Sequence, residues 1–230
     1  MIKSAFTTIF CFWLLCFFSC KIDRNTKYNE KELGLDKITE IPSTHVDNNG
    51  SNNIRGDWQK PGLVVSKFGD LNGKTVVDIG AGSGYFMTHL MQKASKVIAI
   101  DIDQSAIEIL NIVKSAYPKE SQDRIDIRLT PPDKPALKNE EVDAALLVNT
   151  VTYFEDRIGY FKKLKTALKT GGSFIIVDYK MKKLAIDAPL GDQRLNPLQI
   201  EEDLEEAGFA VRWTDDCSLE YQYIILAQKI

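Results

Sequence analysis

The chain has 230 residues, of which 44% are hydrophobic, enough to bury one sizeable core. Its net charge of −3 gives no positive field for a phosphate backbone, so the composition argues against nucleic acid and leaves a small-molecule or protein partner. Three of the four cysteines lie before residue 21, so we expect no intrachain disulfide framework.

The first twenty residues differ from the rest. Lys3 is followed by an apolar stretch over residues 5–18, which is shorter than the roughly 20 residues of a bilayer span and suits a secretory signal. Its end, Leu14-Leu-Cys-Phe-Phe-Ser-Cys20, resembles a bacterial lipoprotein signal, in which a small residue precedes the lipidated cysteine. We therefore expect a signal peptide over residues 1–20 and lipidation at Cys20. The alternative is an uncleaved anchor that leaves the domain in the cytosol.

Residues 21–54 are polar and rich in asparagine, and they have no sustained apolar period. This composition predicts a polar tether between the lipid anchor and a single domain over residues 55–230. The expected location is a membrane-anchored lipoprotein on the periplasmic or cell-surface side, with a cytoplasmic protein as the alternative.

A glycine-rich segment follows the first strand-like run of that domain. Thr75-Val-Val-Asp-Ile is rich in β-branched residues and contains an acid, Asp78. Glycines then follow at alternate positions, Gly80, Gly82 and Gly84, before a new apolar segment. Glycine allows backbone dihedrals that a Cβ forbids and lets a ligand approach the main chain. A nucleotide-binding loop of this kind needs an acid about 20 residues on, and Asp101 ends the next apolar run.

The remaining pattern alternates strands with helices. Apolar runs at 75–79, 97–100, 125–129, 143–148 and 173–177 predict strands, and helical spacing of apolar residues predicts helices between them, with a further helix from Asn196-Pro197 to about Gly208. Near-continuous apolar runs joined by helices indicate a parallel sheet covered on both faces. Two final runs, near 210–214 and 221–228, have no helix between them and should pair antiparallel.

The form Asp78-x-Gly80-x-Gly82-x-Gly84 resembles motif I of the class I S-adenosylmethionine-dependent methyltransferases, whereas a dinucleotide fold usually has its third glycine one residue later. Further similarity lies in Arg55-Gly-Asp-Trp-Gln-Lys-Pro61, in Thr130-Pro-Pro-Asp-Lys-Pro135, in 142–149 and in 168–178. The resemblance implies an α/β, Rossmann-like, doubly wound and mostly parallel seven-stranded sheet, with the last strand inserted antiparallel at the edge.

The resemblance also implies residue roles toward S-adenosylmethionine. Asp78 and the three glycines would form the loop beneath the methionine part, Asp101 would bind the ribose hydroxyls, and Asp133 would lie near the adenine. Asn149 ends the fourth strand, beside the sulfonium. We expect these side chains to meet at the rim formed by the carboxyl ends of the strands.

The segment 55–61 resembles one bacterial subgroup of these enzymes in particular, and one departure from that subgroup affects catalysis. That subgroup commonly has a His-His pair after the fourth strand, whereas this chain has Thr152 and Tyr153 in its place, so the obvious general base is missing. Asn149 and Tyr153 are weak catalytic candidates. With Cys217 and two scattered histidines as the other ligand-type residues, no metal site is expected.

The sequence therefore predicts a methyltransferase with an unknown small-molecule or protein acceptor. Two alternatives stay open. One is a membrane-anchored lipoprotein that keeps the fold as a non-catalytic binding module, and the other is a nicotinamide-dependent oxidoreductase.

Overall fold

The computed structural model describes residues 55–230. The predicted signal peptide, the polar tether and Cys20 lie outside these residues. Within the described part, none of the helices has the length and apolar character needed to cross a membrane.

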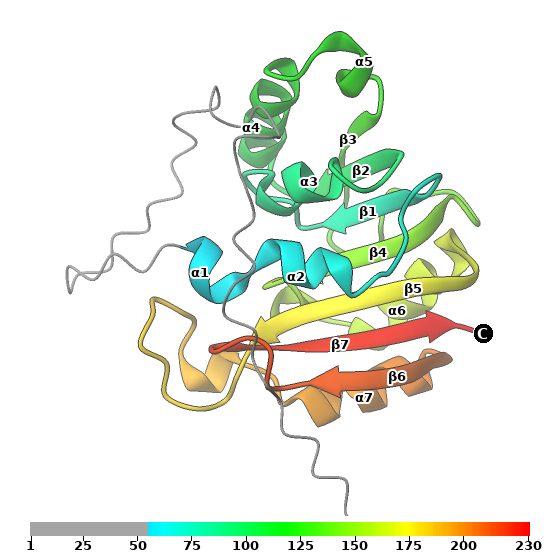
Figure 1. Cartoon of the computed structure of the whole chain (residues 1–230). Coiled ribbons are helices and arrows are strands. Elements are labelled where there is room, and N and C mark those ends of the chain that lie inside the picture. The colour runs from blue at the N-terminus through cyan, green and yellow to red at the C-terminus, as the bar shows by residue number, and fades with distance from the viewer. Residues whose placement is uncertain (1–54) are drawn as a thin grey trace, which may run out of the picture. The chain divides into compact units, whose positions relative to one another are not determined.

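Seven strands form one sheet in the order β3-β2-β1-β4-β5-β7-β6 (Figure 1). The first five run parallel, and β7 pairs antiparallel with both β5 and β6. The strands are β1 (Thr75–Ile79), β2 (Lys96–Asp101), β3 (Ile125–Leu129), β4 (Val142–Val148), β5 (Leu168–Tyr179), β6 (Phe209–Asp215) and β7 (Gln222–Lys229).

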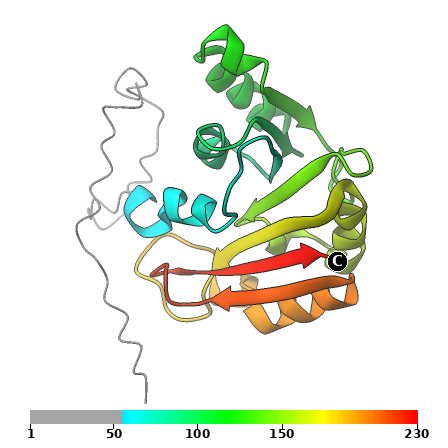
Figure 2. The same cartoon turned by 45° about the vertical axis from the view of Figure 1, so that its right-hand side comes forward.

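Helices cover both faces of this sheet (Figures 1 and 2). One core cluster joins side chains of α2, α3 and α4 to one face, and a second joins α6 and α7 to the other. The helices are α1 (Arg55–Gln59), α2 (Pro61–Ser66), α3 (Tyr85–Leu90), α4 (Gln104–Ser115), α5 (Lys119–Gln122), α6 (Arg157–Ala167) and α7 (Pro197–Glu206), with 3₁₀ turns η3 (Val151–Tyr153) and η4 (Gly191–Gln193).

The helix ends follow local chemistry. Asp103 caps α4 by accepting a hydrogen bond from the Ser105 amide at 2.8 Å, and Asn196 caps α7 through the Leu198 amide at 3.0 Å. Pro197 occupies the first turn of α7, and Gly208 follows the helix with a φ of 85°. The predicted start and stop of α7 are therefore confirmed.

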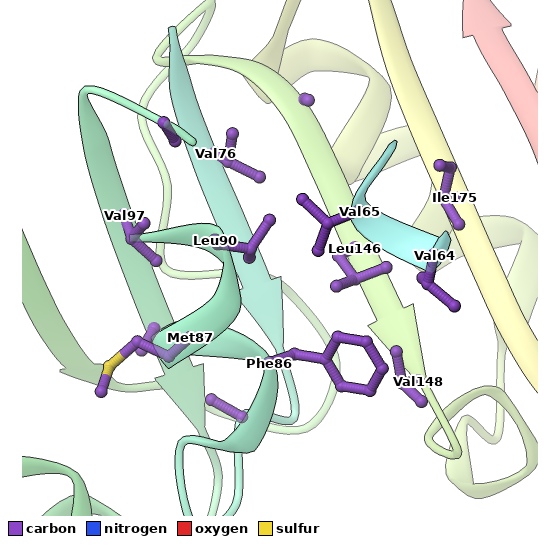
Figure 3. Close-up of a cluster of buried hydrophobic side chains, with 14 of the residues drawn as sticks. Val64, Val65, Val76, Phe86, Met87, Leu90, Val97, Leu146, Val148 and Ile175 are labelled. Atoms are coloured by element: carbon purple, nitrogen blue, oxygen red, sulfur yellow. The ribbon is translucent and has the colours of Figure 1, made fainter. Parts of the chain in front are cut away.

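The first core cluster supports the carboxyl end of the parallel strands. Val64 and Val65 of α2 and Phe86 and Leu90 of α3 are buried over β1 and β4, with the Phe86 ring close to Val148 at the end of β4 (Figure 3). Burial of such side chains stabilises the fold by about 1.5–3 kcal/mol each relative to exposure. The loop between β1 and α3 is thereby held firmly against the sheet.

Two features differ in detail from the sequence prediction. Strand β5 begins at Leu168 rather than near residue 173, because Leu168 pairs with Val142 before an irregularity that includes the two glycines of the predicted turn. Strand β7 is antiparallel as predicted, but it lies between β5 and β6, so β6 is the edge strand. Both outcomes depend on pairing between distant segments, which periodicity does not reveal.

Candidate functional site

Because β1, β2, β4 and β5 are parallel, their carboxyl ends share one rim of the sheet. Asp78, Asp101 and Asn149 all lie at this rim, as predicted. The short helix α1 lies beyond the same ends, on the left in Figure 1, and adds residues from the start of the described chain.

The glycine loop has three positive φ angles, of 71° at Gly80, 54° at Gly82 and 83° at Gly84. A Cβ at Gly80 would lie 2.5 Å from Thr150 Oγ1, so that glycine is needed for packing within the protein. A Cβ at Gly82 would have no atom of residues 55–230 within 4 Å. The backbone at Gly82 is therefore open to a ligand, whereas a side chain at Gly80 would collide with Thr150 even without a ligand.

Asp101 ties the glycine loop to the end of β2. Its Oδ2 accepts a hydrogen bond from the Gly82 amide at 2.8 Å, and its Oδ1 accepts one from the Asp103 amide at 3.0 Å. Each carboxylate oxygen has further lone pairs, so Asp101 can still accept hydrogen bonds from hydroxyl groups. The acid that the spacing associates with the loop therefore lies beside it, and contact of Asp101 with a ribose stays a prediction.

A cavity of about 280 Å³ opens beside this pair. It is lined by Gly80, Asp101 and mostly apolar or aromatic residues from the carboxyl ends of the strands, the connections that follow them and α6. These residues are Ile79, Ile102, Thr130, Pro131, Pro132, Thr150, Tyr153, Phe154 and Tyr160. Ile102 is 60% exposed although it is a large apolar residue. A flat, largely apolar group next to a hydrogen-bond acceptor is the kind of ligand that such a cavity suits.

Asp78 is almost fully buried at the end of β1, and its Oδ2 has no hydrogen-bond partner among the described residues. Burial raises the pKa of this carboxyl to about 7, against the opposing effects of Arg55 and of the Met87 amide. Arg55 of α1 lies over the ring of Tyr85, 4.3 Å from its centroid, and forms no ion pair within residues 55–230. A buried acid and a cation thus face each other at the rim without direct pairing.

Asp133 is placed differently from the other predicted residues. Its side chain is 65% exposed and pairs with Lys163 Nζ at 3.1 Å, an interaction that holds the pKa of Asp133 below its usual value. It does not line the cavity, although the preceding Thr130, Pro131 and Pro132 do. Contact of Asp133 with an adenine stays a prediction, and the loop itself is where the sequence placed it.

Asn149 follows β4 with a φ of 56°, unusual for a residue with a side chain. Its amide is part of a chain of side-chain hydrogen bonds. Arg55 Nε donates to Gln59 Oε1 at 2.5 Å, and Gln59 Nε2 donates to Gln222 Oε1 at 3.0 Å. Gln222 Nε2 donates in turn to Asn149 Oδ1, and Asn149 Nδ2 donates to the Tyr179 hydroxyl at 3.2 Å.

Arg55 and Gln59 belong to the segment 55–61 noted in the sequence, but no role was predicted for them, and Gln222 and Tyr179 were not singled out. Gln59 and Gln222 are 163 positions apart, and both are fully buried. The available signal was a glutamine at the head of an apolar run, since an amide at such a position must find a partner when buried. The sequence alone does not say which partner.

Tyr153, the other catalytic candidate, is 72% exposed in η3 and lines the cavity. Among the described residues, no group of three His, Cys, Asp or Glu side chains is placed to hold a metal ion. His89 is partly buried in α3, beside the Tyr85 ring, and burial lowers its pKa.

Residues 77–176 match the model of a methyltransferase domain family. A ribosomal protein L11 methyltransferase of Alteromonas mediterranea is 34% identical over 104 residues, which are 45% of this chain and 35% of that protein. A protein of Mycolicibacterium smegmatis named as a probable S-adenosylmethionine-dependent methyltransferase is 25% identical over 147 residues, which are 62% of this chain and 54% of that one. The chain thus spans about a third to a half of the length of these curated relatives.

Solved structures share the fold over a larger part of the chain. The crystal structure of a SAM-dependent methyltransferase from Aquifex aeolicus superposes with a TM-score of 0.70 at 21% identity, covering 76% of this chain and 93% of the other. This similarity shows the seven-stranded methyltransferase fold, with the strand order described above.

Proposed function

We propose that the chain is an S-adenosylmethionine-dependent methyltransferase with a small-molecule or protein acceptor. The central observation is the open backbone at Gly82, bonded to Asp101 beside a largely apolar cavity. The match of residues 77–176 to a methyltransferase domain family supports the same conclusion.

The polar groups at the rim fit the two ends of this cofactor. Asp101 offers acceptor lone pairs for ribose hydroxyls next to the apolar walls around Ile102 and Pro131. The unpartnered oxygen of Asp78 suits an ammonium group, and the guanidinium of Arg55 suits a carboxylate. A zwitterionic amino-acid end would satisfy both groups at once, which a nicotinamide dinucleotide would not.

When bound, S-adenosylmethionine supplies a methyl group on a sulfonium, which has its own leaving group. The protein's contribution can therefore rest largely on positioning, and a base is needed only where the acceptor must lose a proton. Asn149 and Tyr153 stand at the rim as candidates for orienting the acceptor.

Two observations favour a second candidate, a membrane-anchored lipoprotein that binds through this site without transferring methyl groups. The His-His pair of the resembled subgroup is replaced by Thr152 and Tyr153, and the predicted export would separate the domain from S-adenosylmethionine made in the cytosol. Turnover to S-adenosylhomocysteine distinguishes the enzyme from the binding module.

Calorimetric titration of residues 55–230 tests the cofactor. We expect S-adenosylmethionine to bind in the micromolar range, about −8 kcal/mol at one micromolar, and NAD not to bind measurably. Asp101→Ala should weaken binding of S-adenosylmethionine by about 1–3 kcal/mol, because hydroxyl groups lose an ionised acceptor and the Gly82 amide loses its partner.

Asp103→Ala is the matched control for this titration. Asp103 is an exposed acid two positions away, which caps α4 through Ser105 and does not line the cavity. Cofactor affinity should stay within about twofold, with a small loss of stability from the missing cap. Preferential binding of NAD, or equal affinity in the Asp101→Ala variant, would contradict the cofactor assignment.

We propose further that the chain is a lipoprotein attached through Cys20, with the domain on the periplasmic or cell-surface side. The supporting observations are the order of Lys3, the apolar stretch, Ser19 and Cys20. Several acyl chains would hold the domain firmly, whereas a single chain anchors only marginally. A cytoplasmic enzyme is the alternative.

Cys20→Ser should release the chain from the membrane fraction or leave its leader uncleaved, as fractionation and mass spectrometry of the N-terminus would show. Cys217→Ser is the control, because Cys217 is an exposed free thiol near the β6–β7 connection and should not affect attachment. A wild-type chain that is soluble, keeps Met1 and has no lipid would sink the lipoprotein proposal.

A further inference from the structure

The amide chain of Arg55, Gln59, Gln222, Asn149 and Tyr179 has one direction. A guanidinium only donates, so Gln59 must turn its oxygen toward Arg55, which leaves the Gln59 nitrogen to donate to Gln222. Gln222 and Asn149 are oriented in the same way, each accepting through its oxygen from the preceding residue and donating through its nitrogen to the next.

The last link decides the state of the Tyr179 hydroxyl. Its oxygen accepts the hydrogen bond from Asn149 Nδ2, so its own proton is left to donate elsewhere, and residues 55–230 provide no acceptor for it. Tyr179 is 8% exposed, and burial raises its pKa, so the hydroxyl keeps its proton. The ring of Trp58 lies 6.3 Å from the Tyr179 ring and helps to hold it in place.

Tyr179 ends β5 and Arg55 begins α1, so both lie at the same rim of the sheet (Figure 1). The charge of Arg55 acts on Tyr179 and on Asp78, and both of these groups act on Arg55 in return. Within residues 55–230, the Tyr179 proton and the two terminal guanidinium nitrogens of Arg55 have no acceptor, and Oδ2 of the buried Asp78 has no donor. Together these groups complement a zwitterion.

We propose that Gln59 and Gln222 are positioning residues that turn the Tyr179 proton toward the ligand, so that Tyr179 and Arg55 together receive the carboxylate of the cofactor's amino-acid end. This inference rests on the proposed function, since it assigns residues to one end of S-adenosylmethionine. It gives β7, a strand far from the glycine loop in sequence, a part in cofactor recognition.

A pair of ligands isolates this contribution. S-adenosylhomocysteine has the amino-acid end, and 5′-methylthioadenosine has the same nucleoside and sulfur without it. Calorimetry on the full-length chain should show that Tyr179→Phe weakens S-adenosylhomocysteine about tenfold and changes 5′-methylthioadenosine by less than twofold.

Gln222→Glu tests the relay at a distance from the ligand. A carboxylate only accepts, so Asn149 must turn its nitrogen toward residue 222 and its oxygen toward Tyr179. The Tyr179 hydroxyl then donates its proton to Asn149 and no longer to the ligand. We expect the same tenfold loss for S-adenosylhomocysteine, and Gln222→Met, which adds no charge, should lose as much. In the Tyr179→Phe background Gln222→Glu should add less than a further twofold.

Gln228→Glu is the matched control, because it makes the same change near the other end of β7, where Gln228 bonds to Arg212 and to the Gly171 carbonyl. Both affinities should stay within twofold. Equal losses for both ligands would reduce the amide chain to a structural element, and additive losses in the double variant would refute the relay. A wild-type chain that binds 5′-methylthioadenosine but gains nothing from the amino-acid end overturns this inference alone. Binding of neither ligand overturns the proposed function with it.

Discussion

Gly82→Val is expected to weaken binding of S-adenosylmethionine at least 100-fold, about 2.7 kcal/mol or more. A Cβ at this position meets no atom of the described part of the chain within 4 Å, so the added side chain would occupy space that these residues leave open beside Asp101. The φ of 54° adds strain of about 1–2 kcal/mol for a residue with a Cβ. Titration calorimetry measures the first effect and urea unfolding the second.

Gly73→Val separates the two effects. Gly73 has a φ of 73°, and a Cβ there would also meet no atom of residues 55–230 within 4 Å. It lies in the turn before β1, at the opposite end of that strand from the glycine loop. The control should show a similar loss of stability with cofactor affinity unchanged. Unchanged affinity in Gly82→Val would show that the ligand does not approach this backbone. Gly80→Val is a poorer probe, because its side chain would collide with Thr150 in the absence of any ligand.

Asp78→Asn is expected to stabilise the free domain at pH 8 by a few kcal/mol while weakening cofactor binding. Burial raises the pKa of Asp78 from 3.8 to about 7, so between these values the folded state holds a proton that the unfolded state has released. The free energy of unfolding then falls by about 1.4 kcal/mol per pH unit as the pH rises through this window. The contribution of Asp78 protonation to the free energy of unfolding is fully present below pH 3.8 and is lost above about pH 7. A neutral amide removes that dependence.

Urea unfolding of residues 55–230 at pH 5 and pH 8 checks the sign of this pH dependence, and calorimetric titration with S-adenosylmethionine at pH 6 and pH 8 checks its effect on cofactor affinity. An ammonium group on the ligand favours the ionised carboxyl, so wild-type affinity should rise from pH 6 to pH 8 and that of Asp78→Asn should not.

Asp178→Asn is the control for the effect of Asp78. Asp178 is also buried with an unpartnered Oδ2, and burial raises its pKa to about 6, but it does not act on Arg55. It should stabilise the domain at pH 8 to a smaller extent and leave cofactor affinity unaltered. A flat pH dependence of wild-type stability would contradict the buried, protonated state of Asp78.

Local sequence was enough for the framework of the site. The strands around Val77, Ile98 and Leu146 could be predicted because long apolar runs between helical periods have few alternatives, and the three glycines with Asp101 because a tight turn needs them at that spacing. These features involve residues that are close in the chain or that share a periodic pattern.

Tertiary structure alone decided which distant residues meet. Asp133 pairs with Lys163, thirty positions away, and so turns from the cavity that its loop lines. Gln222 reaches Asn149 and Gln59 because β7 lies next to β5, and Asn149 directly follows β4, the other neighbour of β5. Periodicity reports which side chains are buried, but the partner of a buried polar group depends on strand order and register, and these are set by contacts between segments far apart in the chain.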